Sequence, residues 1–119
     1  MGYWCGVLFG GLIMDLITGG LYQGQDKYIK ENYNDSFELY PFVEEEYKKR
    51  VSEEDIISKA LLKAKNCEAV NALEIGAGMI PISKEERNFR EIYGRVVCSV
   101  ADESDKVVRI LCGLPTVIK

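Results

Sequence analysis

The sequence predicts an α+β fold, in which one main amphipathic helix packs on a mainly antiparallel sheet with a C-terminal β-hairpin. Three observations predict it: a capped amphipathic stretch at residues 53–66, an alternating run at 68–75, and a pair of alternating runs at 92–101 and 106–112. The 119 residues suffice for a single domain with one core. Within it we distinguish an apolar, glycine-rich start at residues 1–22 from a helix–strand–loop–hairpin unit at residues 52–119.

The helix is predicted from its ends as well as from its apolar stripe. Ser52 is a favourable N-cap, and Asp55 three residues later completes a capping box. Acidic residues fill the first turn and lysines the last, which suits the helix dipole. The apolar positions fall on one stripe and comprise Ile56, Ile57, Ala60, Leu61 and Ala64. We therefore expect this helix to lie on a sheet.

The strands are predicted from alternation of apolar and polar residues. In the run 92–101, Val96, Cys98 and Val100 would share one face, and the run 106–112 follows after the polar turn 102–105. Two such runs around a short turn indicate a hairpin. The residues 76–90 between the first strand and this hairpin read as a long connection.

The middle of the chain offers weaker patterns. Residues 23–36 are polar and predict a loop with at most a short helical turn. Residues 37–43 predict a short edge strand, because Pro41 lacks a backbone donor. The charge run at 44–50 predicts a solvated segment with local ion pairs.

Residues 3–22 form the most apolar stretch of the chain. A transmembrane helix is disfavoured there, because Asp15 interrupts the stretch and five glycines weaken a helix. The flanking residues also lack the pattern of an intact signal peptide. We expect a buried strand or two, or alternatively an interface to a second copy or to an envelope protein. The candidate interface residues are Tyr3, Trp4, Leu8, Phe9, Leu12 and Ile13.

Composition excludes several function classes. Fifteen basic against nineteen acidic residues give a net charge of −4, which argues against a nucleic-acid partner. The chain has no histidine, so histidine-dependent nucleophile systems and most catalytic zinc sites are excluded. The acidic clusters 44–46 and 53–55 stand in solvated contexts. We therefore expect no catalysis, no cofactor and no metal.

The cysteines stand at positions 5, 67, 98 and 112, and none forms a CxxC pair. Cys98 and Cys112 both lie in apolar runs and are expected to be small buried core residues. A disulfide across two neighbouring strands is the alternative. The spacing does not choose among the pairings open to Cys5, Cys67, Cys98 and Cys112.

One glycine-rich turn resembles a cofactor motif. Residues 73–78, Leu-Glu-Ile-Gly-Ala-Gly, are similar to the first motif of SAM-dependent methyltransferases, and they make Gly76 and Gly78 the candidate cofactor-binding residues. The third glycine of that motif is missing. The chain beyond Gly78 is also too short for the rest of a doubly wound sheet. A strand end followed by a loop is the preferred interpretation.

Two further segments resemble small bacterial cell-envelope lipoproteins of uncharacterised function, including TRL-like proteins. Residues 15–20 are similar to their D-x-x-T-G segment, and residues 108–115 are similar to their closing V-x-V-x-G-x-P strand. The resemblance implies an envelope or secreted domain that acts by binding or structural association, if a signal was removed upstream. Membrane association would then need a lipid anchor that the sequence does not show.

Two other functions remain open at this point. A cytoplasmic homo-oligomeric domain could bring its glycine turns, at residues 10–11, 19–20 and 76–78, close to a small ligand. A fragment of a SAM-dependent enzyme is the other alternative.

Overall fold

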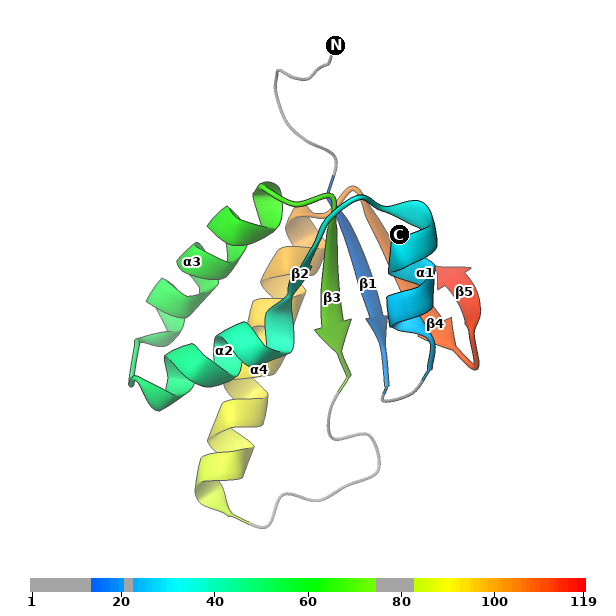
Figure 1. Ribbon diagram of the computed structural model, residues 1–119. Helices are drawn as coiled ribbons and strands as arrows, with labels where there is room; N and C mark the ends of the chain where they lie inside the picture. The colour runs from blue at the N-terminus through cyan, green and yellow to red at the C-terminus, as the bar shows by residue number, and fades with distance from the viewer. Residues whose placement is uncertain (1–13, 21–22, 75–82) are drawn as a thin grey trace.

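The computed structural model describes residues 14–20, 23–74 and 83–119, and it contains four helices and a five-stranded sheet (Figure 1). In chain order the elements are β1 (Asp15–Gly19), α1 (Gln25–Asn32), β2 (Ser36–Glu38), α2 (Leu39–Lys48), α3 (Glu53–Lys65), β3 (Ala69–Leu73), α4 (Lys84–Glu103), β4 (Lys106–Leu111) and β5 (Leu114–Val117). The expected mixture of helices and strands is confirmed.

The sheet has the strand order β2-β3-β1-β4-β5. β1 pairs in parallel with both β3 and β4, and β2 pairs in parallel with β3. β4 and β5 form an antiparallel pair at the C-terminus, where a hairpin was expected, but the predicted partner of residues 106–112 was the run 92–101. The rest of the sheet differs from the antiparallel arrangement that the sequence suggested. The reason is that helices join the successive strands: α1 lies between β1 and β2, α2 and α3 lie between β2 and β3, and α4 lies between β3 and β4. Each helical connection returns the chain to the same end of the sheet, so that these strands run parallel.

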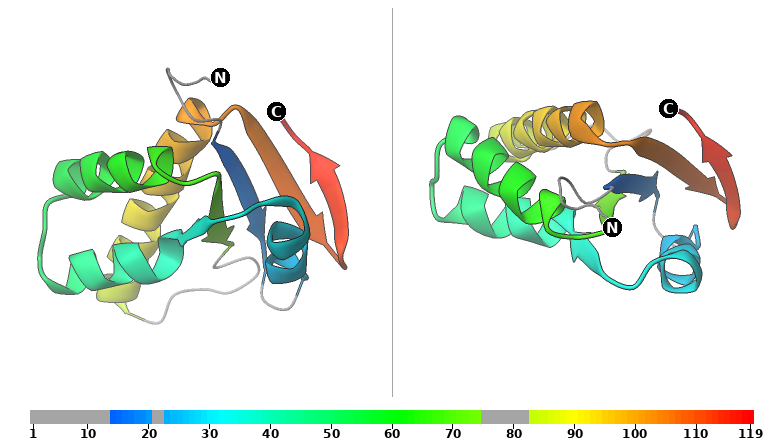
Figure 2. Two further views of the ribbon diagram at one scale, coloured as in Figure 1. Left: turned by 45° about the horizontal axis from the view of Figure 1, so that its top comes forward. Right: turned by 90° about the horizontal axis from the view of Figure 1, so that it is seen from above.

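Helices cover both faces of the sheet unequally (Figure 2). α2, α3 and α4 pack on one face, where the larger core gathers around Leu16, Val70 and Val96. α1 packs on the other face, where Ile29 meets Ile17 and Val108. The odd and even residues of β1 therefore serve different cores, as the alternation of a strand requires.

The predicted helix is confirmed as α3. The Oγ atom of Ser52 accepts a hydrogen bond of 3.3 Å from the backbone N–H of Asp55. Ile56, Ala60 and Ala64 are fully buried against the sheet and α4. The N-cap and the buried apolar stripe that the sequence predicted are therefore both confirmed.

The strand predicted at 92–101 is wrong, because these residues belong to α4. Ser83 caps this helix by accepting a hydrogen bond of 3.1 Å from the N–H of Glu86. Its buried residues are Tyr93, Val96 and Val100, at spacings of three and four. That spacing is helical, and it places Cys98 on the exposed side.

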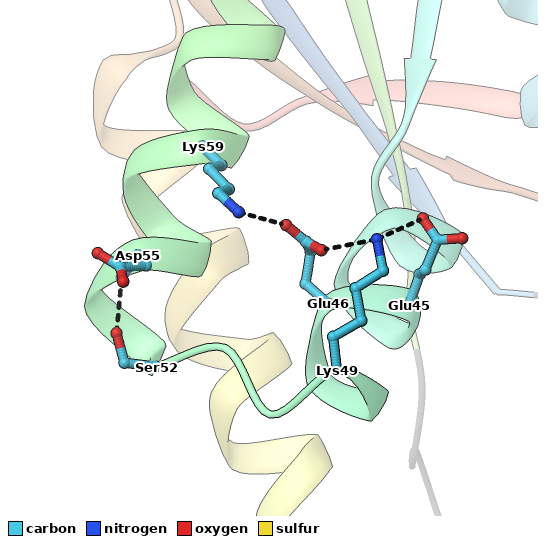
Figure 3. A network of polar contacts seen from close by, with 6 residues as sticks. All are labelled: Glu45, Glu46, Lys49, Ser52, Asp55 and Lys59. Atoms are coloured by element: carbon cyan, nitrogen blue, oxygen red, sulfur yellow. Dashed lines mark hydrogen bonds and ion pairs between the residues drawn. The ribbon is translucent and has the colours of Figure 1, made fainter.

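Three predictions for the middle of the chain are corrected in part. The edge strand covers only Ser36–Glu38, because Leu39 begins α2 and Pro41 lies in its first turn, where a missing N–H costs nothing. The run 44–50 forms the predicted local ion pairs, between Lys49 and Glu45 and Glu46, but residues 44–48 belong to α2 and Glu46 is buried between two lysines (Figure 3). The loop predicted at 23–36 contains α1.

The apolar start is described only from Met14 onward. There β1 is the central strand, and Leu16 and Ile17 are buried on opposite faces. The candidate interface residues Tyr3, Trp4, Leu8, Phe9, Leu12 and Ile13 lie outside the described residues, so the proposed homo-oligomer or envelope partner stays a prediction. Among the described helices, none is long and apolar enough to cross a membrane.

Candidate functional site

A cavity of about 650 Å³ opens at the carboxyl ends of β1, β2 and β3. β1 and β3 are neighbours, but the chain leaves β1 toward α1 on one face and leaves β3 toward α4 on the other. In open parallel sheets this divergence creates the crevice in which ligands bind. The cavity is lined by Gly20, Gly24, Gln25, Asp26, Lys27, Glu38, Tyr40, Pro41, Asn71 and Leu73.

The connection from β1 to α1 forms one wall of this cavity. Gly19 ends the strand, Gly24 follows five residues later, and Gln25 begins the helix. Strand, G-x-x-x-x-G and helix in this order match the spacing of the phosphate-binding P-loop. Both glycines are required here: Gly24 has a φ of 100°, and a Cβ on Gly19 would lie 2.8 Å from the carbonyl oxygen of Ile110.

The two positions after Gly24 depart from the P-loop pattern, which has lysine and then serine or threonine. Gln25 stands at the lysine position and is only 7% exposed. Its Nε2 donates a hydrogen bond of 3.0 Å to the carbonyl oxygen of Gly20. Asp26 stands at the serine or threonine position and lines the cavity. Gln25 therefore supports the glycine loop from within and brings no charge.

The same loop is anchored to the turn between β4 and β5. The N–H of Gly113 donates to the carbonyl oxygen of Gln23 at 2.8 Å, and the N–H of Cys112 donates to Oε1 of Gln23 at 2.7 Å. Gly113 also packs against Gly24, since a Cβ on Gly24 would lie 3.3 Å from the Cα of Gly113. Segments almost 90 residues apart thus fix the end of the loop.

Asn71 joins two carboxylates across the cavity. Its Nδ2 donates to Oε1 of Glu38 at 3.1 Å and to Oδ1 of Asp26 at 3.4 Å. The Oδ1 atom of Asn71 is buried, and it has no hydrogen-bond partner among the described residues. Burial raises the pKa of Glu38, and the charge of Asp26 raises it further, although the hydrogen bond from Asn71 opposes this. The cavity therefore has an acidic side.

A second, smaller cavity of about 230 Å³ lies on the α4 side of the same sheet edge. It is lined by Thr18, Leu73, Glu74, Arg90, Tyr93, Gly94 and Val97, and it shares Leu73 with the first cavity. Arg109 holds Glu74 through two hydrogen bonds of 2.9 and 3.1 Å. Tyr93 donates a hydrogen bond of 2.7 Å to the carbonyl oxygen of Leu73, which fixes α4 against the end of β3.

Of the residues singled out from the sequence, some lie outside the described part of the chain and others are exposed. Gly76 and Gly78 fall outside the described residues. Cys98 and Cys112 are exposed and free, so the expectation that they are buried core residues is wrong, and so is the alternative of a disulfide between them. Cys67 is also free, and burial raises the pKa of its thiol.

Sequence reasoning named the turn at residues 19–20 as one that could approach a small ligand, but it missed Gly24 and the P-loop spacing of the loop that lines the cavity. Residues 15–20 were compared with a lipoprotein segment, whereas they form β1 and the start of this loop. The available signal was the spacing of Gly19 and Gly24 between a strand and a helix. Without the lysine and the hydroxyl residue that normally follow, this spacing does not stand out.

Comparison with known families gives a direct result. A family model described as CobU: Cobinamide kinase / cobinamide phosphate guanyltransferase matches residues 25–118, about four-fifths of the chain. The matched region begins at the first residue of α1 and runs into the end of the C-terminal hairpin. No curated protein matches the chain significantly.

The match corrects four expectations. The resemblance to envelope lipoproteins is wrong, and the argument for an envelope location falls with it. The expectation of a non-catalytic binding domain is wrong, because the matched family consists of kinases and guanyltransferases. The alternatives, a ligand-binding homo-oligomer and a SAM-dependent fragment, fit this family no better.

Proposed function

Because the chain belongs to the CobU family of cobinamide kinases and cobinamide phosphate guanyltransferases, we propose that it acts on cobinamide as a nucleotide-dependent transferase. We place the nucleotide in the larger cavity. The observation that carries this placement is the loop from Gly19 to Gln25, which has P-loop spacing and borders that cavity. A volume of about 650 Å³ is in the usual range for a small-molecule site.

Backbone geometry supports a bound phosphate at this point. In a P-loop the glycines let the backbone approach the phosphates, and the first N–H groups of the helix point at them. Gly24 and the first turn of α1 have the same placement at the cavity wall. Kinase chemistry depends mainly on positioning and electrostatic stabilisation, so a rigid loop is the first requirement. The anchoring of Gln23 to the β4–β5 turn would supply that rigidity.

The smaller cavity is our candidate for the reacting part of the acceptor. A transfer reaction needs donor and acceptor side by side. The two cavities meet at Leu73. Glu74 would form a fixed polar part of the wall there, because the two hydrogen bonds from Arg109 hold its carboxylate in one geometry.

Kinases bind their nucleotide together with Mg²⁺, which neutralises charge on the phosphates. Asp26 and Glu38 fit such an ion, because carboxylate oxygens are ligands that Mg²⁺ prefers and both carboxylates reach the same amide of Asn71. In the described part of the chain there is no cluster of three or more metal-binding side chains. Phosphate oxygens and water would therefore complete the shell, as is usual for Mg²⁺.

The test combines binding and turnover. The purified chain is titrated with GTP, ATP and cobinamide separately by calorimetry. It is then incubated with Mg²⁺, each nucleotide and either cobinamide or cobinamide phosphate. Mass spectrometry of the corrinoid detects a phosphoryl group gained by cobinamide or a guanylyl group gained by cobinamide phosphate. We expect binding of at least one nucleotide and one of these products. If no nucleotide binds and both corrinoids are recovered unchanged, the proposed function is wrong.

A further inference from the structure

The glycine loop of this chain lacks a cation at the position where a P-loop has its lysine. That lysine normally reaches the β- and γ-phosphates as a point charge. Gln25 is neutral, 93% buried and bonded to Gly20, so its amide stabilises the loop and cannot replace the charge. A nucleotide in this cavity needs positive charge from another residue.

Lys27 is placed to supply it. It lies in the first turn of α1, it is exposed, and among the described residues that line the larger cavity it is the one cation. Side chains two positions apart on a helix point in directions about 200° apart. Gln25 therefore points beneath the loop, whereas Lys27 points away from it. Within the described residues Lys27 makes no ion pair, whereas Lys49, Lys59 and Lys65 each bind a carboxylate.

The other charges of the cavity increase the need for this lysine. Asp26 and Glu38 are acidic and line the same space, so they repel phosphates in the absence of a cation. Lys27 is therefore a positive group on a wall whose described residues also include the two carboxylates. A triphosphate would bind with its oxygens toward Lys27 and the helix N-terminus, away from the bare carboxylates.

We propose that Lys27 carries the positive charge that binds the phosphates of the nucleotide, in place of a lysine at position 25. The proposal rests on the function proposed above. It makes Lys27 a positioning residue for the nucleotide and assigns Gln25 the structural role of holding the loop.

The experiment compares GTP with guanosine, which lacks the phosphates. Dissociation constants for both are measured by calorimetry for the wild type, Lys27→Gln, Lys27→Arg and the control Lys30→Gln. Lys30 lies on the same helix, is also exposed and does not line the cavity. We expect Lys27→Gln to weaken GTP binding about 10- to 100-fold, as for loss of one charged hydrogen bond. Guanosine binding should be unchanged, Lys27→Arg should retain most of the GTP affinity, and Lys30→Gln should resemble the wild type.

A second part of the experiment moves the positive charge from position 27 to position 25. In the double variant Gln25→Lys/Lys27→Gln, a lysine returns to the P-loop position, and we expect part of the lost GTP affinity to return. Thermal melts check that each variant is folded. If the wild type binds GTP and Lys27→Gln binds it equally well, the role of Lys27 is refuted while the proposed function stands. Equal loss of GTP and guanosine by a folded Lys27→Gln protein also refutes it. If the wild type binds no nucleotide, the proposed function fails first.

Discussion

Lys59 on α3 donates a hydrogen bond of 3.0 Å from Nζ to Oε1 of Glu46 on α2, and Glu46 is only 5% exposed (Figure 3). Lys49 lies 3.6 Å from the other carboxylate oxygen. Each oxygen of this buried carboxylate thus faces a cation. The hydrogen bond from Lys59 lowers the pKa of Glu46, against the opposing effect of burial. The carboxylate joins two helices of the larger core.

This arrangement makes stability depend on pH. The pKa of Glu46 is lower in the folded chain than the ordinary value of 4.5, so its contribution is complete above that value and is lost as pH falls through the folded pKa. Glu46→Gln should be less stable than the wild type at pH 7, and the difference should close below about pH 4.5. Urea unfolding at several pH values measures it. The control is Glu45→Gln, since Glu45 is exposed and 4.0 Å from Lys49. A difference that stays constant from pH 7 to pH 3 would contradict the prediction.

Two glycines should respond to alanine in opposite directions. Gly24→Ala places a side chain at a φ of 100° and 3.3 Å from Gly113, which should cost about 1–2 kcal/mol of unfolding free energy. Gly94→Ala lies in α4 with open space around it and should stabilise the chain by about 0.5–1 kcal/mol. Chemical denaturation of both variants provides the comparison. Destabilisation of the Gly94 variant would show that this position is more crowded than the structure indicates.

Val108 and Val117 are partners in the β4–β5 pairing, yet they differ in burial. Val108 is fully buried, and Val117 is 60% exposed. Val108→Ala should cost about 2 kcal/mol, from lost transfer energy and the cavity that remains. Val117→Ala should change stability by less than about 0.5 kcal/mol. Equal losses in a urea titration would mean that the outer strand is covered in solution.

Asp26 should control the magnesium dependence of nucleotide binding. Without Mg²⁺ its carboxylate repels the phosphates, so Asp26→Asn should bind GTP several-fold more tightly than the wild type in EDTA. With Mg²⁺ a potential ligand is lost, so the gain on adding Mg²⁺ should be smaller in the variant. Calorimetric titrations in both buffers test this. Glu31→Gln on the same helix is the control. An unchanged magnesium gain in Asp26→Asn would exclude Asp26 as a ligand.

The sequence allowed local elements to be predicted better than their connections. α3 was predictable because its cap, its charges and its apolar stripe agree. β3 and β4 were predictable from alternation. α4 was missed because Val96, Cys98 and Val100 also alternate, and only the spacing of Tyr93, Val96 and Val100 distinguishes a helix. Because residues 92–101 were predicted to be a strand, the helical connection that makes β3 and β4 parallel was not predicted.

The site was harder to predict for a different reason. Its walls come from β1, α1, β2, α2 and β3, so they meet only after the parallel sheet has formed. Asn71 reads as a strand residue in sequence, and its contacts with Asp26 and Glu38 depend on residues 33 or more positions away. Of the features of the site, only the spacing of Gly19 and Gly24 lies within a segment short enough to be recognised from the sequence.

The two hydrogen bonds between Gln23 and the turn at Cys112 and Gly113 make the last strand a support of the proposed nucleotide site, although this strand does not line the larger cavity. That turn keeps its shape because Leu111 and Leu114 pair on either side of it. A chain shortened before Leu114 would release the turn and then the glycine loop, so that nucleotide affinity would fall together with stability. The C-terminal hairpin therefore stabilises the glycine loop near the other end of the chain. The integrity of the hairpin sets how firmly that loop could hold a nucleotide in the proposed site.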